Sequence, residues 1–282
     1  MRIMFINSDW HIHSEYSHDA LNPIDLIAKS AKKQGLFRIG ITDHLNFNDE
    51  KFKGILLASA GAVREAQKTD SNIVLGVELT PIERPEFDYI ASCGKREGYV
   101  PPIQNAPYDI ELAMTKAELM AIGVRYAIGA THWRLDIPFA KSLAPDIDAC
   151  MKEWYRQQMW LACDDRVTIL GHPWWHSQGL WYEDFSVIPR SMNRDIAAAI
   201  KENGKCVECN SQFFYSPKTS EKFRHQYAEF LRELFEMNIR ITYGSDSHNN
   251  YGDSRDAVEH YMRSAGFADG DIYDLSENDL WY

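Results

Sequence analysis

Seven short apolar segments alternate with helix-like segments along most of this 282-residue chain. The apolar segments are rich in β-branched residues and are flanked by turn-forming residues, which is typical of buried strands. They predict strands at residues 2–8, 37–42, 72–77, 125–130, 167–170, 205–209 and 239–244. Helices are predicted between and after them, at residues 22–34, 52–69, 109–122, 145–163, 190–203, 219–237 and 254–265. Such alternation favours a parallel α/β fold, so we predict one barrel-like domain over residues 1–282 rather than an open sheet.

One segment interrupts the alternation of strands and helices. Residues 81–108 carry several prolines and aromatic residues and match neither pattern. We interpret them as a long loop insertion, with a hairpin near Tyr89. Insertions of this length in compact domains often form lids or binding loops.

The charge of the chain narrows the classes of partner. There are 41 acidic and 30 basic residues, which give a formal net charge of −11. A broad surface for nucleic acid or anionic membrane needs the opposite balance. No apolar run reaches the length of a signal-peptide core or the about 20 residues of a membrane-spanning helix. We therefore expect a cytoplasmic protein that binds neither nucleic acid nor membrane.

The cysteines support the same interpretation. There are five, an odd number, and only Cys206 and Cys209 lie close together in the sequence. Residues i and i+3 face opposite sides of a strand, so this pair is poorly placed to hold one ion. We predict buried, reduced thiols rather than a zinc or redox motif.

Residues with metal-binding side chains recur where the predicted strands end. In a (β/α) barrel these ends converge on one mouth, where catalytic groups are found. A single histidine is more often structural, but the recurrence at strand after strand indicates a metal site. Imidazole and carboxylate together suit Zn, Mn or Fe better than Ca or Mg. The residues in question are His11, His13, His44, Glu78, His132, His172, Asp246 and His248.

Other polar residues beside these positions have two interpretations each. Asp9 and Asp43 either accept hydrogen bonds from metal-binding imidazoles or are ordinary strand-end aspartates. Glu208 and Asn210 share a face of their strand and are expected to support the site in a similar way.

Substrate-binding residues are predicted near the same mouth. Trp174, in a loop with Trp175 and Trp181, either stacks on a planar or sugar-like group or packs the rim of the barrel. Arg134 and Arg255 follow two of the histidine motifs, and each could clamp a phosphate or be an exposed arginine without a role.

The ordered set of motifs resembles the PHP (polymerase and histidinol phosphatase) superfamily over about residues 3–250. The resemblance implies a distorted seven-stranded TIM-like (β/α)7 barrel with a trinuclear metal centre. It implies that His11, His13, Glu78 and Asp246 hold a first ion, and that Glu78 bridges to a second held by His132 and His172. It implies a third ion on His18, His44 and His248, with Asp19 as an alternative to His18. The motifs that carry it are His11-x-His13, Ser17-His18, Thr42-Asp43-His44, Glu78, His132, Gly171-His172-Pro173 and Asp246-x-His248.

The sequence is most similar to the histidinol-phosphatase branch, which implies a metal-dependent hydrolase of a small phosphorylated metabolite. Up to three divalent Zn, Mn or Fe ions would serve it, and a hydroxide bridging two of them would attack phosphorus. Asp246 would accept a proton as well as bind metal. Histidinol phosphate is the first substrate to test. The alternatives are a phosphodiesterase or nuclease, an amidohydrolase-type hydrolase on the same site, and a non-catalytic metal-binding protein.

Overall fold

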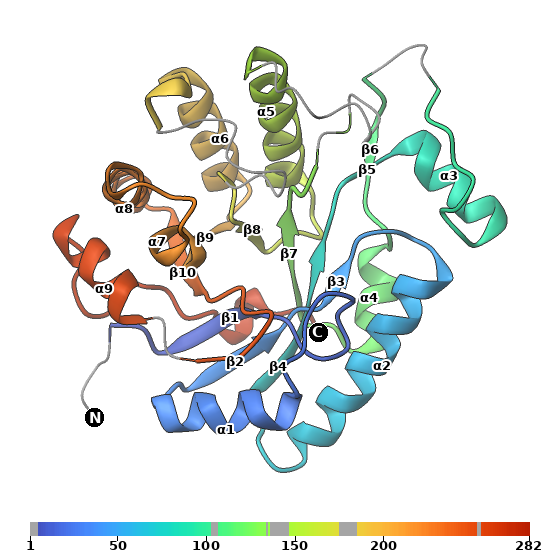
Figure 1. Ribbon diagram of the computed structural model, residues 1–282, viewed down its shortest axis with the longest axis horizontal. Coiled ribbons are helices and arrows are strands. Elements are labelled where there is room, and N and C mark those ends of the chain that lie inside the picture. Colours follow the sequence, from blue (N-terminus) through green and yellow to red (C-terminus); the bar gives the residue numbers. More distant parts are fainter. Residues whose placement is uncertain (1–4, 103–106, 134, 136–146, 175–184, 253–254) are drawn as a thin grey trace.

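A ring of seven parallel strands forms the centre of the protein (Figure 1). The computed structural model describes residues 5–102, 107–133, 135, 147–174, 185–252 and 255–282. Neighbouring strands pair in the order β1 (Ser8–Ile12), β2 (Arg38–Ile41), β4 (Ile73–Leu79), β7 (Tyr126–Ala130), β8 (Ile169–Gly171), β9 (Cys206–Asn210) and β10 (Arg240–Gly244). The predicted seven-stranded (β/α) barrel is therefore confirmed.

The ring closes between β10 and β1, just beyond the end of β10. The backbone N–H of Asp246 donates to the His11 carbonyl at 2.7 Å, and the N–H of His13 donates to the Ser247 carbonyl at 3.1 Å. These bonds join two segments that carry predicted metal-binding residues, so closing the barrel also assembles part of the site.

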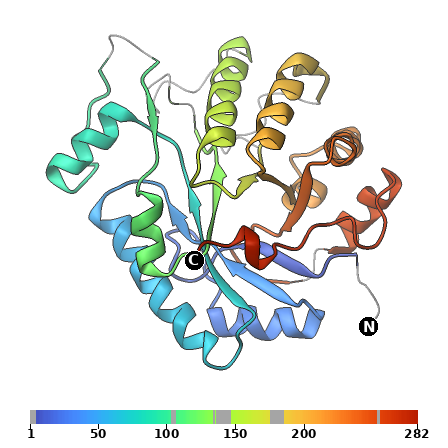
Figure 2. The same cartoon turned by 180° about the vertical axis from the view of Figure 1, so that it is seen from behind.

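Helices cover the outside of the ring (Figures 1 and 2). Each buries one apolar face: in α8, for example, Phe223, Tyr227, Leu231 and Leu234 recur at helical spacing and are buried. Helix starts and ends follow local chemistry, as where Asp49 caps α2 through the Phe52 N–H. The helices are α1 (Ile24–Gln34), α2 (Glu50–Gln67), α4 (Lys116–Ile122), α5 (Ile147–Cys163), α6 (Arg190–Glu202), α7 (Gln212–Tyr215), α8 (Glu221–Glu236) and α9 (Arg255–Ser264), with 3-10 turns at Phe185–Val187 and Glu277–Asp279.

Two strands differ from the prediction. β1 occupies Ser8–Ile12, so the interval 2–8 was placed too early. The reason is that β1 includes polar residues that are buried inside the barrel, among them Asp9 and His11, and apolar content did not mark them as strand. A short extra strand, β3 (His44–Leu45), pairs in parallel with the end of β4 and sets His44 opposite Glu78.

The inserted segment is a helix on a strand pair. The hairpin expected near Tyr89 is wrong, because Tyr89 lies in α3 (Arg84–Cys93), which Pro85 begins at its first turn. The antiparallel strands β5 (Ile82–Glu83) and β6 (Ile110–Glu111) close the base of the segment, which projects beyond α2 in Figure 1. The following helix, α4, begins at Lys116 and not at residue 109, since Thr115 and Glu118 form a capping box there.

The end of the barrel where the strands begin is closed by the C-terminal segment. The N–H of Tyr273 donates to the Ile241 carbonyl and that of Trp281 to the Arg125 carbonyl, each at 2.7 Å. Leu275 and Leu280 pack there in a cluster with the buried rings of Trp10 and Tyr126. The segment crosses the ring in Figure 2. The opposite end, where the strands finish, holds the buried polar groups.

All five cysteines are free; Cys206 and Cys209 are buried in β9, as expected, whereas Cys93 and Cys163 are exposed. None of the helices in the described part of the chain is long and apolar enough to cross a membrane.

Two glycines give a test of the packing inside the ring. A Cβ on Gly40 would lie 1.7 Å from the hydroxyl of Tyr126, which donates to the Trp10 carbonyl at 2.6 Å. We expect Gly40→Ala to lower the free energy of unfolding by about 1–3 kcal/mol through overpacking. Gly54→Ala should raise it by about 0.5–1 kcal/mol, because a Cβ on Gly54 in α2 would meet nothing within 4 Å apart from its chain neighbours and the backbone of its own helix. Urea unfolding of both variants gives the change in the free energy of unfolding. The same change for Gly40→Ala and Gly54→Ala would contradict the packing described.

Candidate metal centre

The carboxylate of Glu78 lies at the centre of a histidine cluster at the carboxyl end of the barrel. Its side chain is fully buried near the end of β4, and nitrogen atoms of five imidazoles lie within 3.5 Å of its two oxygens. Around Oε2 are His44 Nδ1 at 2.6 Å, His13 Nε2 at 3.4 Å and His11 Nε2 at 3.5 Å, and around Oε1 are His172 Nε2 at 3.0 Å and His132 Nε2 at 3.3 Å. The two oxygens therefore face two separate groups of imidazoles.

The first group has the spacing of ligands around one ion. His11 Nε2 and His13 Nε2 lie 3.1 Å apart, and Asp246 Oδ1 lies 3.5 and 3.1 Å from them. Glu78 Oε2 completes the group at 3.5 and 3.4 Å from the same nitrogens. Ligands at about 2.0–2.1 Å from a tetrahedral zinc are about 3.3–3.4 Å apart. The five measured separations match that value.

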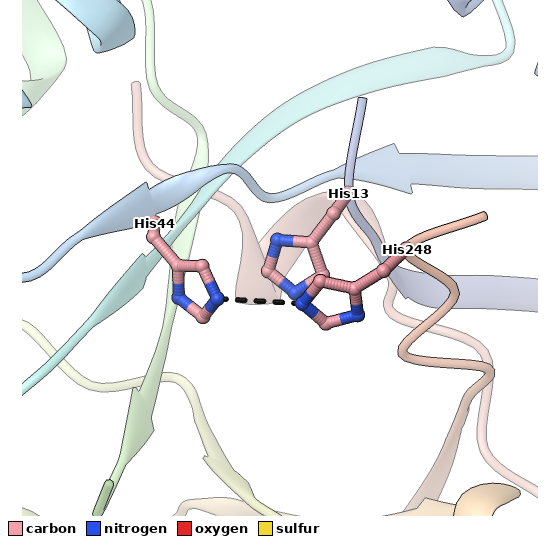
Figure 3. Close-up of side chains that lie close together, drawn as sticks. All are labelled: His13, His44 and His248. Carbon is pink, nitrogen blue, oxygen red and sulfur yellow. Dashed lines mark hydrogen bonds between the residues drawn. The ribbon is translucent and has the colours of Figure 1, made fainter. Parts of the chain in front are cut away.

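A further group lies on the solvent side of His13. His44 Nε2 and His248 Nε2 are 3.5 Å apart (Figure 3), and the ring of His13 stacks on both, with centroids 4.3 and 4.1 Å away. Asp19 Oδ2 lies 3.3 Å from His44 Nε2 and 3.5 Å from His248 Nε2. The other oxygen of Asp19 accepts from the Ser17 hydroxyl at 2.8 Å, which fixes the carboxylate.

His18 does not occupy the place expected for it. Its ring is tilted 5.3 Å from that of His44, and its side chain is 32% exposed. The structure instead puts the Asp19 carboxylate between His44 and His248, the alternative that the sequence left open. The backbone path of the turn after β1 determines that Asp19, and not His18, points between His44 and His248.

Hydrogen bonds from the far side of three rings fix which nitrogen faces the site. His248 Nδ1 donates to the Asp246 carbonyl at 3.0 Å, and His11 Nδ1 donates to Glu208 Oε1 at 2.6 Å. The Thr80 hydroxyl donates to Asn46 Oδ1, so it accepts from His132 Nδ1 at 2.8 Å. When it is neutral, each ring therefore has its proton on Nδ1 and turns the lone pair of Nε2 toward the site, the form in which imidazole binds metal. Thr80 was not predicted, although it follows Glu78 at the two-residue period of a strand.

The charge balance of the site calls for bound cations. Four carboxylates at this end of the barrel are buried, those of Asp9, Asp43, Glu78 and Glu208, whereas no lysine or arginine in the described part of the chain is buried. Buried charges are costly unless they are paired or bind metal. In addition, Glu78 Oε2 is buried and accepts no hydrogen bond among the described residues, and its near neighbours are the imidazole nitrogens named above. The donor set fits divalent transition metals.

The pKa values of Glu78 and the histidines around it show how strongly these buried charges interact. Burial disfavours the charged form of each group, yet His44, His132 and His11 hold the pKa of Glu78 well below its usual range. Burial alone would lower the pKa of His44, but Glu78 and Asp19 raise it to about 10. For His13, burial and the neighbouring charge of His44 lower the pKa to about 3. Without metal, protons on some imidazoles therefore compensate the carboxylates.

Comparison with protein families identifies the architecture. A model described as the PHP domain matches residues 9–212, which is most of the barrel and includes Glu78. The chain belongs to the PHP domain family. Membership supports the classification as a hydrolase acting on phosphoester bonds, and it confirms the family resemblance predicted from the motifs. A search of proteins with curated descriptions found no match.

Solved structures with the same fold include two PHP-type proteins. The first is histidinol phosphate phosphatase from Lactococcus lactis subsp. lactis Il1403, crystallised with zinc, L-histidinol and phosphate. It is 18% identical, with a TM-score of 0.65 over 98% of this chain and 99% of that one. The second is the candidate histidinol phosphatase hisK from Listeria monocytogenes, 14% identical, with a TM-score of 0.59 over 86% of this chain and 95% of that one.

Within this PHP fold, the residues predicted to bind substrate lie elsewhere or outside the described residues. Arg255 donates to the carbonyls of Gln34 (2.9 Å) and Ile6 (3.5 Å), which precede β2 and β1 at the other end of the barrel. Trp174 is buried and packs edge-on against Phe230 at 4.4 Å, so it belongs to the barrel rim. Both predictions are corrected. Arg134, with Trp175 and Trp181, lies outside the described residues.

Asp9, inside β1, and Asp43, just after β2, fix loops of the PHP barrel. Asp9 accepts from the N–H groups of Ser245 and His11 and from the Tyr251 hydroxyl, while burial raises its pKa to about 6. Asp43 accepts from Ser14 and from the Ser59 hydroxyl. These partners are backbone amides and hydroxyl groups. The described contacts therefore do not show either carboxylate accepting a hydrogen bond from a metal-binding imidazole.

Adding zinc to metal-free protein at pH 7 should release protons into solution. Burial alone would lower the pKa of both His11 and His44, but neighbouring carboxylates raise the pKa of His11 well above its usual value and that of His44 to about 10. His44 is therefore an imidazolium at pH 7, and His11 is shifted toward the same charged form. A metal ligand must be neutral imidazole, and the proton has to leave. A pH indicator in weakly buffered solution measures the release, and lowering the pH should weaken binding. Stoichiometric zinc binding with no change in pH would contradict the protonation described.

Proposed function

We propose that the protein is a metal-dependent phosphomonoesterase, similar to histidinol phosphatases, that acts on a small phosphorylated metabolite. The observation that carries the proposal is the placement of Glu78, with one oxygen toward His132 and His172 and the other toward His11, His13 and His44. A carboxylate in this position can bridge two ions a few ångströms apart, as two-metal hydrolases require.

The proposed ligand sets follow these groups. His11, His13, Asp246 and Glu78 would hold one ion, and Glu78, His132 and His172 a second. His44, His248 and Asp19 would hold a third, with His18 beside them. Zn, Mn or Fe, up to three ions in all, fit this mixture of imidazole and carboxylate.

Bound ions would supply an activated water and Lewis acidity toward phosphoryl oxygens. The chain's own contribution is positioning and proton transfer. Asp246 Oδ1 faces His11 and His13, while its Oδ2 accepts from Asn210 Nδ2 at 3.2 Å. This hydrogen bond fixes the plane of the carboxylate, and we propose that Asp246 accepts the proton of the attacking water. Imidazole ligands are neutral, so the mouth stays less negative toward an anionic substrate than a purely carboxylate site would be.

Histidinol phosphate is the first substrate to test, because the Lactococcus lactis relative was crystallised with L-histidinol and phosphate. A phosphodiester nuclease is a weaker candidate, since the net charge of −11 does not favour a nucleic-acid groove. The predicted cytoplasmic location and the single domain over residues 1–282 stay predictions.

Purified protein loaded with Zn, Mn or Fe should hydrolyse phosphomonoesters in preference to phosphodiesters. Asp246→Asn and His132→Ala should each lower kcat by about 10²–10⁴-fold and leave the unfolding temperature close to that of the parent under metal-free conditions. The measurement is phosphate release from a panel that includes histidinol phosphate and a bis-ester. His225→Gln, on the exposed face of α8, is the matched histidine control. Metal binding without hydrolysis of any ester in the panel would contradict the proposal.

The choice between Asp19 and His18 can be tested separately. Asp19→Asn should reduce the number of tightly bound ions, because Asp19 Oδ2 faces His44 and His248, whereas His18→Gln should retain it. Metal content after gel filtration, measured by mass spectrometry, gives the answer. Loss of an ion in the His18 variant alone would reverse the assignment.

A further inference from the structure

Glu208, on β9, is a buried carboxylate that lies directly beneath the histidine cluster without facing it. Its side chain is 1% exposed, and it is outside the proposed ligand sets. Oε1 accepts from His11 Nδ1 at 2.6 Å. Oε2 accepts from the backbone N–H of His172 at 2.5 Å and from Asn210 Nδ2 at 3.2 Å. Both oxygens are therefore engaged by N–H donors.

These contacts join the two groups that share Glu78. His11 belongs to the first group and His172 to the second, and Glu208 is bonded to both. His172 has φ = 27°, in the left-handed region that is unfavourable for a residue other than glycine. The hydrogen bond to Glu208 holds its N–H in that conformation.

Asn210 extends the network to a third residue. Its Nδ2 donates to Glu208 Oε2 and to Asp246 Oδ2, each at 3.2 Å. Asp246 also has a left-handed backbone, with φ = 51°. The carboxylate of Glu208 is thus connected to His11, His172 and Asp246, which come from three different strand ends.

The barrel leaves room for Glu208 at one position in particular. A Cβ on Gly244, at the end of β10, would lie 1.9 Å from Glu208 Oε1 and 2.7 Å from the Cβ of His11. Gly244 has no left-handed conformation to explain the glycine. The space is needed by the carboxylate. The Tyr227 hydroxyl also donates to the Glu208 carbonyl at 3.0 Å and accepts from the Asn210 N–H at 3.0 Å, which fixes the end of β9.

We propose that Glu208 is the positioning residue of the metal centre, an inference that rests on the proposed function. It holds His11 in the Nδ1–H tautomer, so that Nε2 faces the first ion, and it holds the backbone of His172 so that the ring reaches the second. One carboxylate would therefore position a ligand of each of the two ions while remaining outside both ligand sets.

The isosteric variant Glu208→Gln tests this role sharply. An amide has one acceptor oxygen and one NH₂ group, whereas His11 Nδ1–H and the His172 N–H both need an acceptor. If the NH₂ group faces His11, the ring must move its proton to Nε2 and loses the lone pair that faces the site. If the NH₂ group faces His172, it meets the backbone N–H of His172, another donor, and the hydrogen bond that holds His172 is lost. We expect the affinity for zinc to fall by about 10–100-fold, measured by competition with a chromogenic chelator.

Two further measurements keep the test independent of folding. Gly244→Ala retains the carboxylate but occupies its space, and it should lower zinc affinity by a similar factor. In metal-free parent protein, ¹⁵N NMR of histidine should report His11 as the Nδ1–H tautomer or as imidazolium, and not as the neutral Nε2–H form. Glu202→Gln, at the exposed end of α6, is the matched control and should bind zinc like the parent.

The outcomes separate this inference from the proposed function. Unchanged zinc affinity in both Glu208→Gln and Gly244→Ala, or a neutral Nε2–H His11 in the parent, would overturn the positioning role. Parent protein that binds zinc but hydrolyses no phosphomonoester would overturn the proposed function, while the difference in zinc affinity between parent and Glu208→Gln would still support the positioning role.

Discussion

The structure depends on one electrostatic problem, the burial of the Glu78 carboxylate among five imidazoles. A buried carboxylate without compensation is strongly destabilising, and the described part of the chain buries no lysine or arginine near it. Either protons on the histidines or bound cations must supply the positive charge. The ring nitrogens that face Glu78 converge at the spacing of metal ligands. Bound cations could therefore neutralise the carboxylate without a rearrangement of these side chains.

The barrel assembles this site through its closure. The hydrogen bonds between β1 and the segment after β10 bring His11 and His13 beside Asp246, and the register of β3 with β4 places His44 opposite Glu78. A layer of hydrogen-bonding groups then orients the rings, with Thr80 behind His132 and Glu208 behind His11. The C-terminal segment closes the other end of the barrel, so the polar groups are concentrated at one mouth. Family membership and the related solved structure agree with the barrel fold.

The sequence predicted the structure best where a pattern of residues recurs along the chain. Strand–helix alternation predicted the barrel, and metal-binding residues at successive strand ends predicted the cluster around Glu78. Prediction failed where packing in three dimensions determines the bounds of a strand or the role of a side chain. The polar strand β1 was placed too early because burial of Asp9 and His11 leaves no apolar pattern. Trp174 and Arg255 have suitable side chains, but Trp174 packs against Phe230 and Arg255 donates to the backbone carbonyl of Gln34 at the end of α1. Asp19 lies nearer than His18 to both His44 and His248 because of the backbone path of the turn after β1, which the sequence pattern does not predict.

Anomalous X-ray scattering from crystals grown with zinc, collected on both sides of the zinc absorption edge, tests the central claim most directly. The account predicts separate peaks beside the two oxygens of Glu78, one among His11, His13 and Asp246 and the other beside His132 and His172. Side chains in these same positions with no anomalous peak at Glu78, in protein saturated with zinc, would contradict it.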